Sequence, residues 1–272
     1  MISKYTKIVA TISDKRCDVD FIKALYENGM NVVRMNSAHL DREGFKRIIN
    51  NVRAVSDKIG ILMDTKGPEI RTTATVGDEP LQFATGDRVL IAGLPDRLSE
   101  KERICVSYTR LAEDVEVGKH ILIDDGELDF LVLAKEEGAL LCESQNSGEL
   151  GSRKSVNVPG VRINLPSLTE RDKTNILYAI EEDIDFIAHS FVRNKQDVLD
   201  IQQILDEHNS PIKIISKIEN QEGVDNIDEI LEATYGVMVA RGDLGIEVAQ
   251  EYIPGIPVSY THLRAHETRR HL

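Results

Sequence analysis

Apolar stretches of strand length alternate with amphipathic stretches of helix length at the beginning of the chain. Residues 7–12 (KIVATI), 31–35 (NVVRM) and 60–65 (GILMDT) are short apolar runs typical of strands. The segments between them, 18–29 and 43–58, carry apolar residues at the spacing of a helix that buries one face. Consecutive parallel strands need a crossover helix, so this alternation predicts a parallel sheet covered by helices.

The pattern changes between about Glu69 and Pro159, where short alternating strands are separated by turn sequences. DDG at 124–126 and EEG at 136–138 are typical of tight hairpin turns. The helix–strand alternation resumes with a helix over 167–183, in which Thr169 and Asp172 have the spacing of a capping box. Strands are predicted at 185–192, 212–219 and 236–243, with a helix near 224–233.

About six strand units lie outside the β-rich stretch, whereas a closed (β/α)₈ barrel has eight. We therefore predict an α/β fold: a partial (β/α)₈ TIM barrel with an inserted all-β barrel domain. The expected boundaries are 1–68 and 160–256 for the two barrel parts and 69–159 for the insert.

The last segment, 257–272 (PVSYTHLRAHETRRHL), has no apolar period and interrupts the helix–strand pattern. Its core resembles an in-frame translation of a sequencing adapter, so we expect the native sequence to end near Ile256. Its HETRRH motif is not a zinc site, because His266 and His271 are five residues apart and HExxH needs a spacing of four.

Composition narrows the class of function. A formal net charge of −13 argues against a nucleic-acid-binding surface. The three cysteines form no CxxC pair, which favours a reducing, cytoplasmic compartment. No apolar run reaches the roughly 18 residues of a membrane-spanning helix, so no membrane partner is expected.

Charged residues lie at the ends of the apolar strands. Lys217 and Glu219 are two residues apart in the run 211–223 (PIKIISKIENQEG), so on a strand they would share one face. Burying such charges costs several kcal/mol unless they are paired or bound to a ligand. A buried salt bridge explains that pair alone, but polar residues also end the other strands: Arg34, Asn36, Asp64, Ser190 and Asp243. Because the carboxyl ends of barrel strands form the active-site face, we predict a site there.

Four stretches carry a resemblance to a known family. VVRMNSAH (32–39), DTKGPEIRT (64–72), SKIENQEG (216–223) and MVARGDLGIE (238–247) follow in this order, with the β-rich insert directly after the second. Together with SVNVPG (155–160) and SFVR (190–193), they closely resemble the pyruvate kinase family over residues 4–256. The resemblance implies glycolytic phosphoryl transfer from phosphoenolpyruvate to ADP, by a longer homo-oligomeric enzyme of which this chain is the N-terminal part.

The resemblance also implies roles for individual residues. The expected catalytic residues are Lys217, Arg34 and Arg71. Substrate would be held by Arg34, Lys217, Ala240, Gly242 and Asp243, and the nucleotide would lie near Asn36, His39, Arg71 and Lys154. Cationic side chains of this kind suit phosphoryl transfer, which depends on positioning and charge neutralisation. His39 and Lys154 are also compatible with ordinary surface positions, and Ser190 with a packing role.

Two cofactors follow from the resemblance. Glu219 and Asp243 would hold Mg²⁺ (or Mn²⁺), which suits a pair of carboxylates. Asn36, Asp64 and the carbonyl of Thr65 would hold K⁺. Ala38 stands where the family has a potassium-ligating serine, so the affinity for a monovalent cation is in question.

Two other functions remain open from the sequence. One is a catalytically inert fragment that retains only partial binding, which is the activity expected of this chain by itself. The other is a magnesium-dependent enolate lyase or aldolase on a similar barrel. The inserted β domain and the spacing of Lys217 and Glu219 favour the kinase. No GxxxxGK[ST] motif occurs, so a P-loop is unsupported.

Removing residues 257–272 should leave the melting temperature unchanged, because this segment has no apolar face to bury. Thermal denaturation of chains 1–256 and 1–272 measures the difference. A lower melting temperature for the shorter chain would contradict the adapter interpretation.

Overall fold

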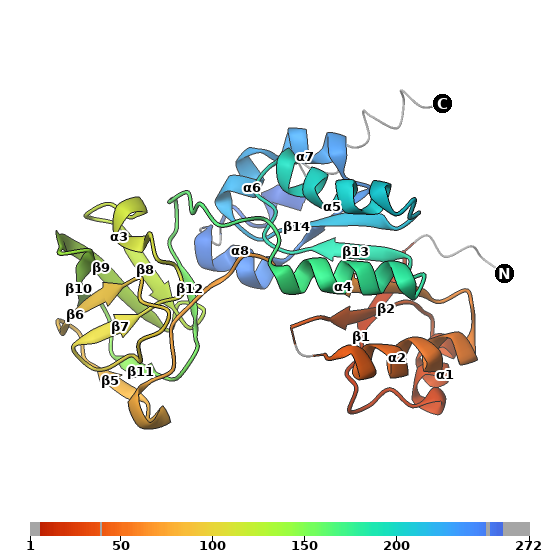
Figure 1. The fold of residues 1–272 in the computed structure, drawn as a ribbon, viewed down its shortest axis with the longest axis horizontal. Coiled ribbons are helices and arrows are strands. Elements are labelled where there is room, and N and C mark those ends of the chain that lie inside the picture. The colour runs from red at the N-terminus through yellow and green to blue at the C-terminus, as the bar shows by residue number, and fades with distance from the viewer. Residues whose placement is uncertain (1–5, 39, 249–250, 258–272) are drawn as a thin grey trace. The chain divides into compact units, whose positions relative to one another are not determined.

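The computed structural model describes residues 6–38, 40–248 and 251–257 (Figure 1). The chain divides into two compact units. The first contains the residues up to Pro68, together with Pro166–Ile218 and Asn226–Met238. The second contains Glu69–Leu165, Glu219–Asp225 and the described residues from Val239 onward. The domain boundaries expected from the sequence stay predictions.

A six-stranded sheet forms the centre of the first unit. Its order is β1 (Ile8–Thr11), β2 (Met30–Asn36), β3 (Gly60–Asp64), β13 (Phe186–His189), β14 (Lys213–Ile218) and β15 (Gly236–Val239). The pairs β1–β2, β2–β3, β3–β13 and β13–β14 are all parallel, and both Asn36 and Ala188 lie opposite Asp64. The predicted partial TIM barrel of about six strand units is thereby confirmed.

Amphipathic helices cover this sheet because each buries one apolar stripe. They are α1 (Val19–Glu27), α2 (Arg42–Val55), α4 (Glu170–Glu181), α5 (Lys195–Glu207) and α7 (Ile227–Ala233). In α2, Phe45, Ile48 and Val52 are buried, and the Asp41 side chain caps the helix by accepting the Gly44 N–H at 2.7 Å.

The structure differs from the sequence prediction near the end of the described chain. The strand predicted over 236–243 ends at Val239, and Arg241–Glu247 forms helix α8. Asp243 lies in the first turn of that helix, where a carboxylate is favourable. The helix predicted near 224–233 is two helices, α6 (Gln221–Asp225) and α7. They separate at Asn226, whose side chain donates to the Arg193 carbonyl instead of pointing into solvent.

The second unit contains a seven-stranded sheet and a two-stranded pair. The sheet order is β4 (Ile70–Arg71), β12 (Ser155–Asn157), β8 (His120–Ile123), β9 (Leu128–Glu136), β10 (Ala139–Ser144), β6 (Arg88–Ala92) and β7 (Arg103–Cys105). The pair is β5 (Leu81–Phe83) with β11 (Gly148–Leu150). Two short helices, η1 (Val76–Asp78) and α3 (Leu111–Asp114), complete the insert. A bridge between Thr72 and Val106 joins the two ends of the sheet order, which closes the predicted β insert on itself.

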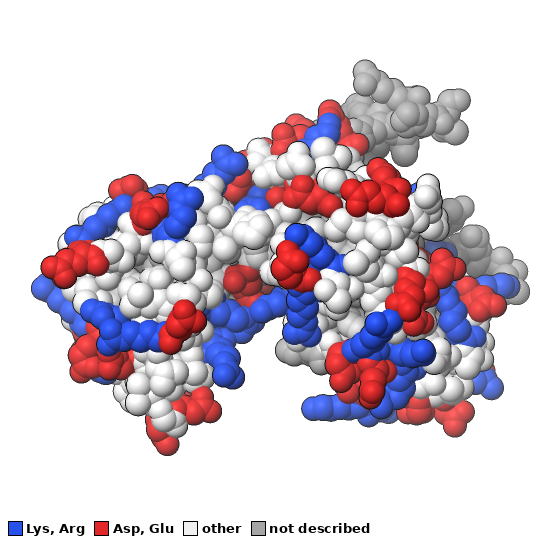
Figure 2. Space-filling model, viewed as in Figure 1, with Lys and Arg blue, Asp and Glu red and all other residues white. Residues whose placement is uncertain are grey.

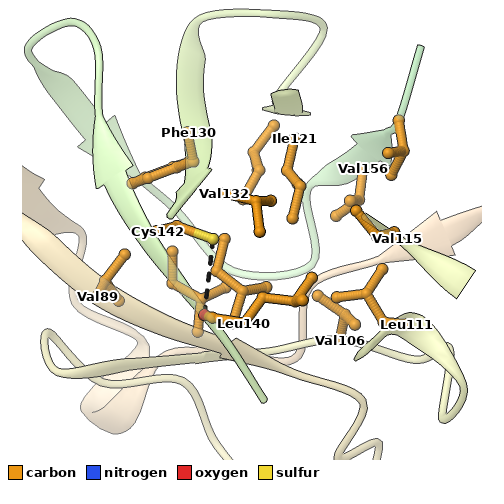
Figure 3. Close-up of a cluster of buried hydrophobic side chains, with 14 of the residues drawn as sticks. Val89, Val106, Leu111, Val115, Ile121, Phe130, Val132, Leu140, Cys142 and Val156 are labelled. Carbon is orange, nitrogen blue, oxygen red and sulfur yellow. Dashed lines mark hydrogen bonds between the residues drawn. The ribbon is translucent and has the colours of Figure 1, made fainter. Parts of the chain in front are cut away.

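Tight hairpins and an apolar interior stabilise this β unit. The turn between β8 and β9 contains Asp124, Asp125 and Gly126, all with positive φ, and β9 and β10 connect through Glu137 and Gly138. Both predicted hairpin turns are therefore present. Figure 3 shows the side chains that fill the interior, among them Ile121, Phe130 and Leu140, each fully buried. On the face shown in Figure 2, acidic and basic side chains lie interspersed.

The predicted capping box at the start of α4 is present, and it connects to a second element. The Thr169 hydroxyl accepts the Asp172 N–H at 3.1 Å, and the Asp172 carboxylate accepts the Thr169 N–H at 3.1 Å. The same carboxylate, which is fully buried, also accepts the Lys66 N–H at 2.7 Å. Asp172 thus fixes the chain that follows β3 to the start of α4.

Replacing Asp172 should cost more stability than replacing its capping partner. We expect Thr169→Ala to lower the free energy of unfolding by about 1 kcal/mol. Asp172→Ala should lower it by roughly 1–3 kcal/mol more, because it leaves buried N–H groups unpaired. Urea denaturation measures both, with Lys173→Ala on the exposed face of α4 as the control. Equal losses for the two variants would show that the Lys66 contact contributes nothing.

Candidate active site

Three strands of the first unit, β2, β3 and β14, bring charged side chains together toward their carboxyl ends. The Asp64 carboxylate, 2% exposed at the end of β3, is the centre of this group. Arg34 of β2 donates from Nε to Asp64 Oδ1 at 2.9 Å and from Nη2 to Oδ2. The Lys217 ammonium of β14 lies 3.4 Å from Asp64 Oδ2. A buried carboxylate is therefore compensated by two cations, as its desolvation requires.

Lys217 is itself buried and is held by a hydroxyl group. It is 7% exposed, and its Nζ donates to Ser190 Oγ at 2.9 Å. Ser190 in turn donates its hydroxyl to the Thr65 carbonyl at 2.8 Å and its N–H to Thr65 Oγ1 at 3.0 Å. The packing role assigned to Ser190 from the sequence is thus incomplete, because its hydroxyl connects Lys217 to the end of β3.

The backbone around Ser190 is tightly constrained. Phe191 has a φ of 57°, which is uncommon for a bulky residue and tends to occur at functional sites. Gly67 faces the same segment with a φ of 73°, and a Cβ there would lie 2.9 Å from the Ser190 carbonyl oxygen. A glycine is therefore required at this position, and the close approach fixes where Ser190 presents its hydroxyl.

Glu219 does not lie on the strand that carries Lys217. β14 ends at Ile218, one residue before Glu219. The expectation that both residues share one strand face stays a prediction. Glu219 is nevertheless buried, with 1% exposure directly after the strand.

The three predicted potassium ligands lie at adjacent strand ends. Asn36 is the register partner of Asp64, and Thr65 follows Asp64 directly. Each supplies an oxygen, the donor type that such a cation prefers, but each oxygen already has a partner. The Asn36 side chain accepts the Ala38 N–H at 3.0 Å, Asp64 holds Arg34, and the Thr65 carbonyl holds Ser190. Ser37 Oγ is buried and has no hydrogen-bond partner among the described residues.

The other predicted residues belong to the second unit. Arg71 lies at the end of β4, and its Nε donates to Glu69 Oε2 at 2.9 Å. Lys154 pairs with Asp124 at 2.7 Å. The remaining predicted residues of this unit are at the start of α8: Ala240 as N-cap, with Gly242 and Asp243 exposed in the first turn. Gly242 also lines a cavity of about 1050 Å³ together with Asp125, Asn146 and Arg241. His39 lies outside the described residues, as does segment 258–272.

His189 is a buried residue of the site that the sequence reasoning does not identify. It is 1% exposed, and its Nδ1 lies 3.2 Å from Thr65 Oγ1. Burial lowers the pKa of His189 to about 4, against the opposing influence of the Asp197 and Asp172 carboxylates. The only available sequence signal is a histidine inside an apolar strand, directly before the serine at the strand end.

A family model described as "Pyruvate kinase, barrel domain" matches residues 3–259. The chain belongs to this family. It is 49% identical over 255 residues to a pyruvate kinase of Borreliella burgdorferi, a match that covers 93% of this chain and 53% of the relative. It is 47% identical over 256 residues to a pyruvate kinase of Bacillus licheniformis, covering 92% of this chain and 43% of the relative.

A solved structure of a pyruvate kinase from Cryptosporidium parvum has the same fold, with a TM-score of 0.88 and 38% identity. The match covers 92% of this chain and 53% of that one. The chain thus spans about half the length of the pyruvate kinases it matches.

Among residues 6–38, 40–248 and 251–257, no three His, Cys, Asp or Glu side chains are grouped as a metal site. Two carboxylates suffice for Mg²⁺, which usually keeps several waters. No helix in the described part of the chain is long and apolar enough to cross a membrane.

The buried histidine should make the protein labile to acid. Because the pKa of His189 falls from 6.5 to about 4 on folding, the unfolded chain takes up a proton that the native chain refuses. The stability contributed by the neutral ring is complete above pH 6.5 and is lost as the pH falls toward 4. Between pH 6.5 and 5 the loss should be about 2 kcal/mol.

Urea denaturation of the wild type and of His189→Leu at pH 7 and pH 5 measures this loss. The wild type should lose more stability than the variant over this range. Parallel decreases in the two proteins would contradict a depressed histidine pKa.

Proposed function

We propose that the strand ends of the first unit are the phosphoryl-binding face of a pyruvate kinase. Such an enzyme transfers the phosphoryl group of phosphoenolpyruvate to ADP and yields pyruvate and ATP, the reaction that pyruvate kinases contribute to glycolysis. The observation that carries the proposal is the buried Lys217 ammonium, held between Asp64 and Ser190. The family membership and the names of the relatives support the same reaction.

Lys217 would act by stabilising negative charge that develops during the transfer. An ammonium whose position is fixed before the reaction stabilises such charge without reorganisation, and it acts more strongly where water is excluded. Its low exposure and its two oxygen partners supply both conditions. We infer that Asp64 holds the ammonium in place, while charge on the moving phosphoryl group and on the forming enolate is neutralised from its other side.

Arg34 and Arg71 would bind phosphate oxygens through their guanidinium groups. The Arg34 side chain is 28% exposed although it is paired with Asp64, so it reaches the surface at the strand ends. Asn36, Arg71 and Lys154 are the proposed nucleotide contacts, together with His39. Ala240, Gly242 and Asp243 are the proposed contacts to the substrate carboxylate and phosphate.

The donor chemistry of the chain fits the expected metals. Glu219 and Asp243 are carboxylates of the kind that bind Mg²⁺ or Mn²⁺, and Glu219 is buried, where a carboxylate needs a cation or hydrogen-bond donors. When bound, the divalent ion would neutralise phosphate charge. Asn36, Asp64 and Thr65 would hold K⁺ through oxygen atoms, and the buried Ser37 hydroxyl offers a further oxygen beside Ala38.

We expect the 272-residue chain by itself to bind phosphoenolpyruvate without turnover. The described sheet ends in two edge strands, β1 and β15, where a closed barrel has no edge. A lactate-dehydrogenase-coupled assay for pyruvate tests turnover, and calorimetry with Mg²⁺ and phosphoenolpyruvate tests binding. Cleavage of oxaloacetate or a 2-oxo acid in a parallel assay would instead favour the lyase or aldolase.

The role of Lys217 is best tested in a chimaera with the Borreliella burgdorferi enzyme, in which the 255 matched residues come from this chain. Lys217→Met keeps the length of the side chain and removes its charge. We expect kcat to fall by roughly 10³-fold, with a much smaller change in KM for phosphoenolpyruvate. Lys213→Met is the matched control, because Lys213 begins the same strand and is exposed.

A melting curve beside the kinetics separates the charge-neutralising role from a purely structural one. If Lys217 only compensates Asp64, its loss should lower stability by roughly 3–5 kcal/mol while kcat remains within tenfold of wild type. That outcome would remove Lys217 from the catalytic set.

A further inference from the structure

The chain of contacts behind Lys217 does not stop at Ser190. Ser190 makes two hydrogen bonds to Thr65, through its hydroxyl at 2.8 Å and its N–H at 3.0 Å. The Thr65 hydroxyl has one further neighbour, Nδ1 of His189, at 3.2 Å. All four residues are less than 9% exposed and belong to the first unit. His189 therefore lies at the inner end of a series that begins at the reactive ammonium.

The direction of each hydrogen bond follows from the groups involved. Thr65 Oγ1 accepts the Ser190 N–H, and its single proton is left for another acceptor. If His189 carried its proton on Nδ1, that proton would donate to the second lone pair of Thr65 Oγ1, but the Thr65 proton would find no acceptor among the described residues and Nε2 would be an unpaired buried acceptor. If His189 carries its proton on Nε2, the Thr65 hydroxyl donates to Nδ1 and only the Nε2 proton lacks a partner among the described residues. The second arrangement leaves fewer buried groups unsatisfied.

We propose that His189 is a positioning residue: its Nδ1 accepts the Thr65 hydroxyl proton, which fixes Thr65 and Ser190 and so sets the position of the Lys217 ammonium. This proposal rests on the proposed function for the importance of Lys217, but the contact series itself is independent of any substrate. His189 touches neither substrate nor cofactor in this scheme.

The orientation of the Thr65 hydroxyl affects Ser190 because Thr65 accepts two hydrogen bonds from that residue. Its side chain holds the Ser190 N–H, and its carbonyl holds the Ser190 hydroxyl. A Thr65 side chain that rotated away would release the Ser190 backbone next to Phe191, whose left-handed conformation needs support from its surroundings. The Ser190 oxygen would then no longer be aimed at Lys217.

The first test reads the histidine tautomer in the 272-residue chain labelled with ¹⁵N-histidine. The ring signals that disappear in His189→Leu belong to His189. A long-range ¹H–¹⁵N spectrum should show a protonated Nε2 and an unprotonated Nδ1. A protonated Nδ1 in the wild-type chain would overturn the proposal.

The second test follows the ¹H–¹³C signal of the Lys217 ε-methylene, assigned by its loss in Lys217→Met. We expect this signal to shift in His189→Leu and in Thr65→Val, with little further shift in the double variant because both act through one hydroxyl. His189→Asn, whose side-chain oxygen can replace Nδ1 as the acceptor, should restore the wild-type position. Ile187→Val on the same strand is the packing control, since Ile187 is fully buried and apolar. A shift in the control as large as that in His189→Leu, or no shift in His189→Leu, would overturn the proposal.

The third test uses the chimaeric enzyme and separates this proposal from the proposed function. His189→Leu should lower kcat roughly 10-fold with little change in KM, the size of effect seen when supporting contacts behind a reactive group are lost. His189→Asn should recover most of the rate. If Lys217→Met leaves the rate intact, the proposed function fails while the spectroscopic shifts can still hold. If Lys217→Met abolishes the rate and His189→Leu does not lower it, the positioning role alone fails.

Discussion

The buried carboxylate of Asp64 is the constraint on which the first unit depends. At 2% exposure it has lost most of its hydration, and it is stable as an anion only because Arg34 and Lys217 lie beside it. Those two cations come from β2 and β14, on either side of β3 in the sheet order. The charge group therefore exists only if four strands, β2, β3, β13 and β14, run parallel with their carboxyl ends level. The ion pairs of Asp64 therefore depend on the order of the strands in this sheet.

The features that follow from local pattern were predictable from the sequence. Apolar runs and helical spacing indicated the alternating elements, and parallel strands imply that polar residues at their carboxyl ends converge. The capping box at Thr169 and the hairpin turns with Asp125 and Gly138 are local signals of the same kind. Such signals are reliable because each depends on residues only a few positions apart.

The partners of individual charges could not be read in the same way. Asp64, an acidic partner of the Lys217 ammonium, lies far earlier in the chain, and no local pattern in the sequence pairs the two residues. Strand alternation applies only while the strand continues, and β14 ends at Ile218. The strand predicted over 236–243 was wrong in its last part, because the chain turns into helix α8 after Val239. GVMV has the composition of a strand, and the residues that follow it carry no clear signal that a helix begins there.

Ser190 and His189 show why the interior of a site is harder to predict than its rim. Neither residue type is unusual at a strand end, and their significance comes from Thr65, which only the fold brings close. The same contacts explain how a strained Phe191 and a buried Lys217 persist in one small region. Each unfavourable feature is offset by hydrogen bonds that the neighbouring strand supplies, so the site is stable only as a whole. An ammonium fixed in this way needs no reorganisation, which is the property that the charge stabilisation proposed for Lys217 requires.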